Sequence, residues 1–581
     1  MAKEKKLTSA QAVERLNEIL SGICVDDKLI KELPDYHGEQ GPEHSLLKAC
    51  MGEGVIDSFF PIHDGKTVLA CWRSKNWSLI SPPIDEIRAY FGDREAFYFA
   101  WVSHYCKMAL VPGVIGTVIW LFSRVFEVTI DENPVAPLFG IFVAIWANLY
   151  LKLWTRQAAE LSWGWGSFNA EKQEKVRPEF KGELRVSPVT GLEERYFPYQ
   201  RRLMQYGISL LVTLPLILVV VLVMFTLLNL QGYITDPASP FIVPALADLA
   251  APGELFDPAG PYALVPVVGY SVVVMFLNKW YRSVAEWLTA MENHRTDSSH
   301  QDALVIKRVI FEMFDCYSAL LYVAFYKLDI IRLREEVLAL FTADEIRRVA
   351  LESLVPFLIG WFSNLGKRKE TADKLKKDED SSGLVDPEED AGKDFNEDFD
   401  DYLELVVQFG YISLFATACP LAAMLAVLSN IIEMRSDLFK LCFVTRREPN
   451  HSHSNIPHSW LTVLSFVAYA SVLTNCLIIG CTSHQMRAWF PSLFDEEAKR
   501  LSMQALCDPE DEPCLREAAQ DAALMPVAPG KGDNLMSYIF FSEHLLLIIC
   551  FVLRSAINNV PKAVKHGYKR KKFLESHPNL A

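Results

Sequence analysis

Long apolar segments recur along this chain, and they limit its fold more than any other feature. A bilayer core of roughly 30 Å needs about 20 helical residues, and segments of 15 to 30 mostly apolar residues begin after Phe91. The clear ones are Met108–Phe122, Pro134–Leu151, Gly207–Leu230, Ala263–Leu277, Leu403–Ile432, Ser459–Cys481 and Leu535–Leu553. Two more, Ala303–Leu328 and Val349–Phe362, are apolar but interrupted by charge. The pattern predicts an integral, multi-pass, α-helical membrane protein.

The segment Leu403–Ile432 is too long for one ordinary span and contains Pro420. Glu404 and Glu433 lie equally far from a point beside Cys419 and Pro420. If the chain folds back there, each arm rises roughly 21 Å, and both carboxylates return to the same depth. Counting this segment as a hairpin predicts ten transmembrane helices.

Composition supports a membrane class and argues against several others. Of 581 residues, 51% are hydrophobic and the mean hydropathy is +0.13, more apolar than a soluble protein of this size requires. The net charge is -15, but residues 378–401 hold twelve carboxylates against one lysine, so the rest is nearly neutral. We therefore expect no nucleic-acid partner. No nucleophile elbow, P-loop or H-E-x-x-H motif is present, so we do not expect an enzyme.

The chain divides by composition. Residues 1–95 predict a cytoplasmic α+β domain, with a helix at Ala10–Leu20 and a β-rich stretch at Thr67–Arg73. Residues 96–560 predict the transmembrane domain, within which 378–400 form an acidic linker, and 561–581 form a basic cytoplasmic tail. Loop charge agrees with this arrangement, because the loop from Gln231 to Tyr262 has no Lys or Arg. This loop is expected outside the cytoplasm, and both termini inside.

Inserting a charged residue into a membrane span costs about 2.5 to 3.5 kcal/mol of free energy, so such residues are functional candidates. Asp401 and Glu404 are spaced i,i+3, Glu433 and Asp437 are spaced i,i+4, and each pair shares a helix face. Glu352 lies in the preceding span, with Glu345 two turns earlier. Carboxylates at one depth repel one another, and calcium, with six to eight oxygen ligands, would remove the conflict. The alternative is that these acids are solvated among headgroups, or pair with Arg347, Arg348 or Arg435.

The stretch from Phe399 to Asp437, FDDYLELVVQFGYISLFATACPLAAMLAVLSNIIEMRSD, resembles the seventh and eighth helices of the anoctamin family of calcium-activated membrane proteins. Further similar motifs occur in family order: FFPIHD at 59–64, IRAYFGDREAFYFAW at 87–101, RSVAEWLTAMENHRT at 282–296 and YVAFYK at 322–327. Two motifs, DDYLEL at 400–405 and LESLVPF at 351–357, are most similar to the branch of the family associated with the endoplasmic reticulum.

The resemblance implies a homodimer with an N-terminal ferredoxin-like domain and ten helices per subunit. It also implies a lipid-facing groove lined by helices three to seven, and two calcium ions between helices six, seven and eight. Carried over by position, the ligands are Glu352, Asp401, Glu404, Glu433 and Asp437, the same five acids that the cost of burial selects.

Two departures from the family pattern affect these sites. Where the family usually has an asparagine ligand, one turn before Glu352, this chain has Arg348, whose fixed charge would modify the site, and Glu345 would compensate with a further carboxylate. An accessory calcium site of the family corresponds to Lys152, Arg554 and Asn559. Two cations and an amide do not suit calcium, so we expect no calcium there.

The resemblance favours a calcium-activated phospholipid scramblase, with phospholipids as partners, in the endoplasmic reticulum or plasma membrane. A calcium-activated anion or nonselective ion channel and a membrane-contact tether remain alternatives. Calcium would draw helix six toward helices seven and eight through a hinge at Pro356 or Gly360. With Arg348 screening the acids, some activity without calcium is expected. Groove candidates, which ordinary interhelical hydrogen bonding explains as well, are Tyr270, Ser271, Tyr317, Ser318 and Tyr322.

Overall fold

The computed structural model places most of the chain in two compact units. It describes residues 7–25, 41–45, 59–126, 135–168, 179–186, 193–234, 239–257, 260–262, 265–348, 398–447, 455–483, 485–495 and 527–577, with isolated residues between these ranges. Unit 1 combines residues 1–173 with 334–581, and unit 2 is the continuous stretch 174–333.

The prediction of a helical membrane protein is confirmed. Six described helices are long and apolar enough to cross a bilayer. They are α6 (Asp93–Val125), α7 (Ala136–Trp165), α8 (Tyr199–Leu230), α11 (Asp297–Tyr322) with its extension η3 (Val323–Lys327), α17 (His458–Leu477) with η6 (Ile478–Thr482), and α21 (Gly532–Ala556). The count of ten spans stays a prediction, because α10 (Val265–Met291), α12 (Ile330–Arg348), α15 (Asp398–Leu414) and α16 (Ala422–Phe439) do not meet the same criterion.

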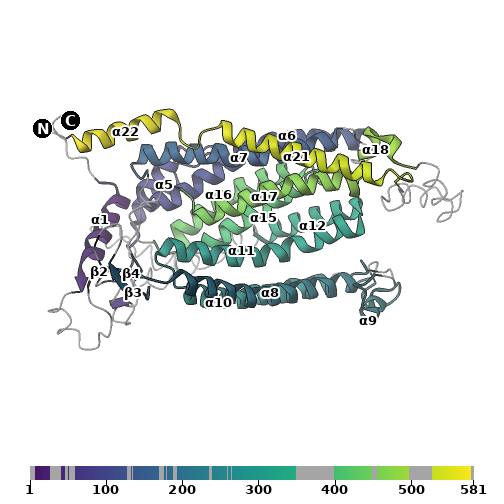
Figure 1. The fold of residues 1–581 in the computed structure, drawn as a ribbon. Coiled ribbons are helices and arrows are strands. Elements are labelled where there is room, and N and C mark those ends of the chain that lie inside the picture. The colour runs from purple at the N-terminus through teal and green to yellow at the C-terminus, as the bar shows by residue number, and fades with distance from the viewer. Residues whose placement is uncertain are drawn as a thin grey trace, which may run out of the picture. The chain divides into compact units, whose positions relative to one another are not determined.

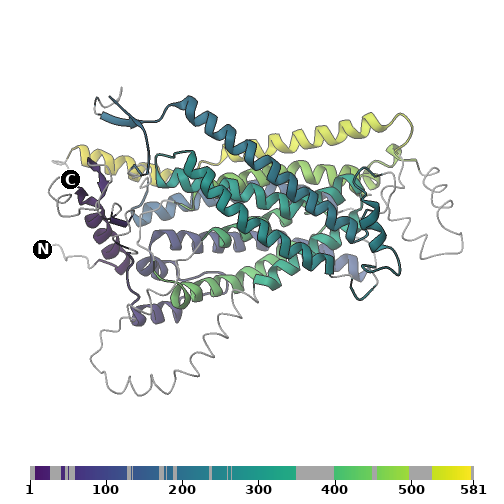
Figure 2. The same ribbon diagram turned by 90° about the horizontal axis from the view of Figure 1, so that it is seen from below.

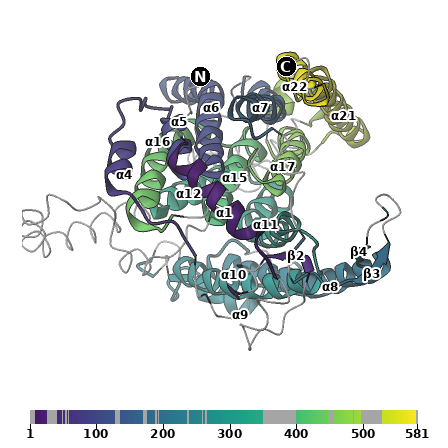
Figure 3. The ribbon, with the colours of Figure 1, turned by 90° about the vertical axis from the view of Figure 1, so that its left-hand side faces the viewer.

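Unit 1 is built around α6, α7, α15, α16 and α17, which Figure 3 shows nearly end-on. Aromatic rings fill the space between these helices. Tyr402 of α15 lies between Trp101 of α6, at 5.4 Å between ring centroids, and Trp460 of α17, at 5.5 Å. All three side chains are at most 2% exposed. The shorter elements that follow α17 in this unit are α18 (Gln485–Trp489), η7 (Pro491–Leu493) and, after α21, α22 (Lys562–Ser576).

The predicted hairpin is confirmed. α15 ends at Leu414, α16 begins at Ala422, and Pro420 lies in the turn between them. Two amides join the arms, because Asn430 Nδ2 donates to Gln408 Oε1 at 2.8 Å and Gln408 Nε2 donates to Asn430 Oδ1 at 3.1 Å. This pairing is centred beside Cys419, as the positions of Glu404 and Glu433 predict.

The N-terminal elements agree with the sequence only in part. The predicted helix is present as α1 (Ser9–Gly22), but the β-rich stretch predicted at Thr67–Arg73 is wrong, since these residues lie in α4 (Gly65–Trp72) and its C-cap. Asp64 accepts a hydrogen bond from the Lys66 amide and starts the helix. Val68 and Cys71 are buried at i,i+3, which is the spacing of a helix face and not the i,i+2 spacing of a strand.

The other N-terminal elements do not establish a ferredoxin-like domain. Besides α5 (Ile84–Phe91), the described part of the region holds one antiparallel pair, β1 (Cys24–Val25) with β2 (Gly41–Ser45). The ferredoxin-like fold therefore stays a prediction.

Unit 2 is a bundle of α8, α10 and α11, whose teal ribbons run side by side in Figures 1 and 2. Its centre is the stacked pair of Tyr281 and Phe311, whose ring centroids are 3.9 Å apart. Ile217 and Val220 of α8 pack in the same cluster. The smaller elements are a hairpin of β3 (Glu183–Val186) and β4 (Glu193–Tyr196), with α9 (Pro244–Ala247) and η2 (Asp248–Ala250) after α8.

The turn between α15 and α16 depends on two glycines. A Cβ added at Gly116 of α6 would overlap the Pro420 carbonyl oxygen, and one at Gly140 of α7 would overlap Thr417 Cγ2. Close packing of backbone against backbone is possible at Gly116 only without a side chain.

We predict that Gly116→Ala lowers the stability of the detergent-solubilised protein by about 1–3 kcal/mol, because the added methyl overpacks a site that cannot shift. Thermal unfolding measures the effect. Gly164→Ala in α7 is the control, since a Cβ there has nothing within 4 Å. Equal melting temperatures for the two variants would contradict the prediction.

Candidate calcium site and the surrounding helices

α15 and α16 carry four of the five predicted calcium ligands. Asp401 and Glu404 lie on the first turns of α15, and Glu433 and Asp437 lie on the last turns of α16. Asp401 is 6% exposed and Asp437 is 3% exposed, while the two glutamates are half-buried. The alternative of carboxylates fully solvated among headgroups therefore does not hold for the two aspartates.

α6 closes one side of this acidic cluster. The Tyr98 hydroxyl donates a hydrogen bond of 2.6 Å to Asp437 Oδ2. The carboxylates of Asp401 and Glu433 also lie close enough to act electrostatically on the Tyr98 hydroxyl. The Glu433 charge acts in the same way on the Cys106 thiol, about two turns further along α6. Carboxylates from two helices thus gather around one tyrosine.

A lysine that the sequence analysis missed neutralises part of this charge. Lys440 Nζ lies 2.9 Å from Asp401 Oδ1. Lys440 opens η5 (Lys440–Val444), a π-helical turn that continues α16. Its place three residues after Asp437 and seven after Glu433, on the same helix face, is the signal that would have found it.

Arg435, one of the cations proposed as an alternative partner for the acids, points elsewhere. Its guanidinium lies 3.7 Å from the ring centroid of Trp77 and 5.9 Å from that of Trp72. This cation–π arrangement holds Arg435 against the N-terminal region. Among the described residues, Lys440 and not Arg435 supplies the compensating charge.

α12 packs beside α15 in an antiparallel register. Arg334 Nε donates to the Ala418 carbonyl oxygen at 3.0 Å, and Phe341 meets Tyr411 with ring centroids 6.1 Å apart. From Arg334 to Phe341 the chain advances by seven residues, and their partners, Ala418 and Tyr411, lie seven residues apart in the reverse direction. The same register brings the end of α12, at position 348, level with position 404 of α15. The side chains of Glu345 and Arg348, and the whole of Glu352, lie outside the described residues.

The described residues alone do not make up a metal site. Carboxylate oxygens are the donors that calcium prefers. Within the described ranges, however, no three Asp, Glu, His or Cys side chains are grouped closely enough to hold a metal ion. The carboxylates present are the kind of donor that calcium prefers, and a calcium site with Glu352 as a further ligand stays a prediction.

The predicted groove residues have mixed placements. The side chains of Tyr270 and Ser271 lie outside the described set. Tyr317 and Tyr322 are 4% and 7% exposed, and the Tyr322 ring packs against Phe225 of α8 at 5.4 Å between centroids. The Ser318 hydroxyl is buried with no hydrogen-bond partner among the described residues. A role in lining a groove stays a prediction for all five.

The three residues at the position of the family's accessory calcium site do lie together. Lys152 Nζ of α7 donates to the Asn559 side-chain oxygen, and the Arg554 charge of α21 acts on Lys152. Arg554 itself lies over the Tyr469 ring at 5.0 Å and approaches Asn148 Oδ1 at 3.5 Å. None of these described neighbours is an acid.

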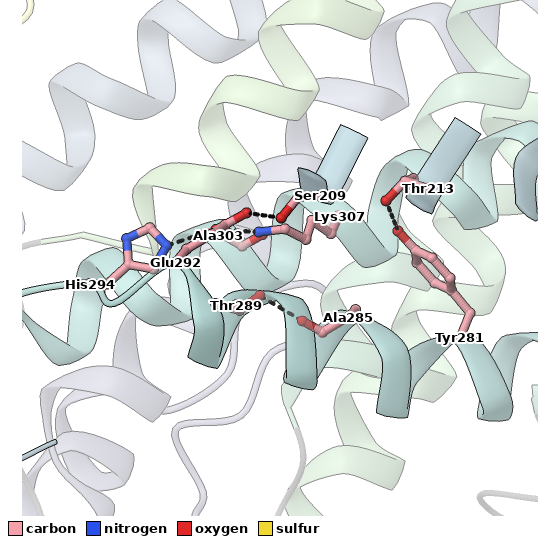
Figure 4. Close-up of polar contacts among 9 residues, drawn as sticks. All are labelled: Ser209, Thr213, Tyr281, Ala285, Thr289, Glu292, His294, Ala303 and Lys307. Carbon is pink, nitrogen blue, oxygen red and sulfur yellow. Dashed lines mark hydrogen bonds and ion pairs between the residues drawn. The ribbon is translucent and has the colours of Figure 1, made fainter. Parts of the chain in front are cut away.

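A separate polar cluster joins the three helices of unit 2 (Figure 4). Glu292 follows α10 directly, and its side chain is 2% exposed. Its carboxylate accepts hydrogen bonds from Ser209 of α8 at 2.5 Å, His294 at 2.9 Å and Lys307 of α11 at 2.6 Å. Burial works to raise the Glu292 pKa, but these hydrogen bonds and the Lys307 charge outweigh it and lower the pKa.

Comparison with known proteins agrees with the resemblance of the motifs. Residues 87–571 match the family described as "Anoctamin: Calcium-activated chloride channel". The chain belongs to the anoctamin family. Human Anoctamin-10 is 32% identical over 555 residues, covering 94% of this chain and 74% of that protein. Human Anoctamin-7 is 26% identical, covering 76% of this chain and 55% of that protein. Members of this family are channels or scramblases and not enzymes.

We predict that Lys440→Met destabilises the protein without calcium by about 1–3 kcal/mol. Removing one partner of a buried pair costs about 3–5 kcal/mol, and the 27% exposure of Lys440 reduces that cost. Calcium should raise the melting temperature of this variant more than that of the wild type. Lys66→Met, on the exposed surface of α4, is the control. Unchanged stability in EGTA would show that Lys440 does not neutralise Asp401.

The Glu292 cluster predicts a pH dependence. Because folding lowers the Glu292 pKa, its stabilisation is complete above the ordinary glutamate pKa of about 4.3 and is lost as pH falls through the lower, folded value. Glu292→Gln should therefore melt below the wild type at pH 7, and the gap between the two melting temperatures should narrow only as the pH falls below about 4.3. Glu286→Gln, which removes an exposed ion pair with Arg282 on the same helix, should show no such narrowing.

Proposed function

We propose that this protein is a calcium-activated phospholipid scramblase, which moves lipids between leaflets along a hydrophilic path facing the membrane. The observation that carries the calcium part is the acidic cluster. Asp401 and Asp437 are almost fully buried between membrane helices, beside Glu433 and one lysine. Charge of this kind inside a membrane protein is retained for a function.

In the proposed mechanism, the acids are only partly compensated without calcium. Lys440 forms an ion pair with Asp401, and the Tyr98 hydroxyl donates a hydrogen bond to Asp437. Bound calcium would supply the remaining positive charge and hold Glu352 after α12 together with the acids of α15 and α16. Calcium then favours whichever arrangement of α12 offers it more ligands. The register of α12 against α15 supports this proposal, since it brings the last residue of α12 level with Glu404.

A lipid path needs a wall of helices that can move without unfolding. Unit 2 suits that role because it has its own apolar core at Tyr281 and Phe311 and its own polar cluster at Glu292. α8 also exposes large apolar side chains, with Leu211 at 72% and Leu218 at 57%, which suits contact with acyl chains. These features support a bundle that shifts as one body.

The second candidate is a calcium-activated ion channel. The family description, which names a chloride channel, favours it. A channel needs a lining that excludes lipid and offers cations to the anion, whereas a scramblase needs a polar path open to the bilayer. The resemblance of the sequence motifs to one branch of the family supports our choice of scramblase. A homodimer, and a location in the endoplasmic reticulum or the plasma membrane, belong to the same proposal.

The test is bleaching of fluorescent lipid by dithionite in proteoliposomes. A scramblase exposes inner-leaflet label, so calcium should increase the bleached fraction beyond one half. Glu433→Gln removes one ligand charge and should shift the calcium response to concentrations about ten-fold higher or more. Glu18→Gln, on the exposed face of α1, is the matched control and should behave as wild type.

Two further outcomes separate the candidate functions. Calcium-dependent ion flux without bleaching of the inner leaflet would favour the channel. If neither ion flux nor bleaching of the inner leaflet is detected, the membrane-contact tether is the remaining candidate. If the site modifier Arg348 screens the acids, the wild type should scramble slowly in EGTA, and Arg348→Asn should reduce that activity. An absence of activity in EGTA, with an unchanged calcium response in Arg348→Asn, would contradict this role.

A further inference from the structure

The end of α21 and the helix after it carry positive charge that no acid compensates among the described residues. Lys152 and Arg554 lie on α7 and α21, and their described partners, Asn559, Asn148 and Ser465, are all neutral. Five residues separate the end of α21 at Ala556 from the start of α22 at Lys562. Six Lys or Arg residues occur in α22 against one acid, Glu575.

The packing of α22 decides which way these cations face. Val564 is 4% exposed, and a Cβ added at Gly567 would lie 2.5 Å from Trp163 Cζ2, so this face lies against the end of α7. Tyr568 adds an edge contact with Phe168, with ring centroids 5.4 Å apart. Figure 1 shows α22 beside the end of α7. The contact holds α22 in a fixed orientation.

A second face of α22, turned away from the contact with α7, carries a stripe of lysines. Helical spacing of three and four residues aligns Lys562, Lys565, Lys569 and Lys572, and all four are exposed. None makes an ion pair with another described residue. Phe573, beside this stripe, is 52% exposed. We call these four lysines together with Lys152 and Arg554 the C-terminal basic strip.

From this arrangement we propose that the C-terminal basic strip binds the headgroups of anionic phospholipids. Arg554 lies in the last turn of α21, a helix apolar enough to span a bilayer, and it acts on Lys152, while the lysines of α22 follow within a few residues. Cations beside a span attract anionic lipid, each by about five-fold in affinity. Neutral polar neighbours hold Arg554 in place without cancelling its charge, which leaves that charge for a phosphate. Binding here does not depend on transport.

The experiment compares lipid binding to the purified full-length protein in detergent, measured by native mass spectrometry. The probes are phosphatidylserine and phosphatidylcholine with matched acyl chains, and inorganic phosphate. We expect phosphatidylserine to bind at least ten-fold more tightly than phosphatidylcholine, and salt of about 0.5 M to reduce this preference by shortening the screening length. Inorganic phosphate at the same concentration should not displace phosphatidylserine.

The main variant is K562Q/K565Q/K569Q/K572Q, which should lose most of the preference for phosphatidylserine. Its control, R15Q/K66Q/R73Q/K75Q, removes the same charge from exposed positions of the N-terminal elements and should keep the preference. A second variant, K152Q, tests the part of the strip on α7 without altering α22. An unchanged preference in the main variant, an equal loss in the control, or displacement by inorganic phosphate would each overturn the proposal. Lipid scrambling by the main variant at wild-type rates would leave it intact, since binding and transport are measured separately.

Discussion

Several carboxylates must coexist between the packed helices α15, α16 and α6, and the rest of unit 1 is arranged around that requirement. The hairpin of α15 and α16 brings the acids together, α6 donates a tyrosine hydroxyl, and Lys440 adds one positive charge. A buried charge without such partners would cost several kcal/mol. The aromatic packing around Tyr402 and the glycines at the hairpin turn keep these helices close enough for the partners to reach the acids.

Much of this arrangement follows from local sequence. The hairpin could be predicted because a proline interrupts thirty apolar residues and two glutamates flank it evenly. The pairing of Gln408 with Asn430 confirms that symmetry. In contrast, Lys440 was missed because a search for lysines within spans does not reach a residue just beyond the last apolar turn. The partner of Tyr98, 339 residues away in sequence, depends on how α6 packs on α16, which no local pattern specifies.

In the N-terminal region, the local sequence led to a wrong prediction of secondary structure. Residues 67–73 contain β-branched and apolar side chains in a short run, for which strand and helix periods are hard to distinguish. The Asp64 cap decides in favour of a helix, and its effect is visible only when the hydrogen bond to the Lys66 amide is known. In unit 2, the Glu292 cluster likewise combines residues of three helices, so its members look unrelated along the chain.

The π-helical turn at Lys440–Val444 has a further consequence. It accommodates one residue more than an α-helical turn would, and it ends just before Thr445 and Arg447. The carbonyl oxygen of Thr445 lies 3.2 Å from His63 Nε2, and Arg447 donates to the Tyr90 carbonyl oxygen. Removing a single residue from this turn would rotate everything after it by roughly 100° relative to α16. Insertions and deletions here should therefore be rare among homologues, because the length of this turn keeps the contacts of Thr445 and Arg447 in phase with α16.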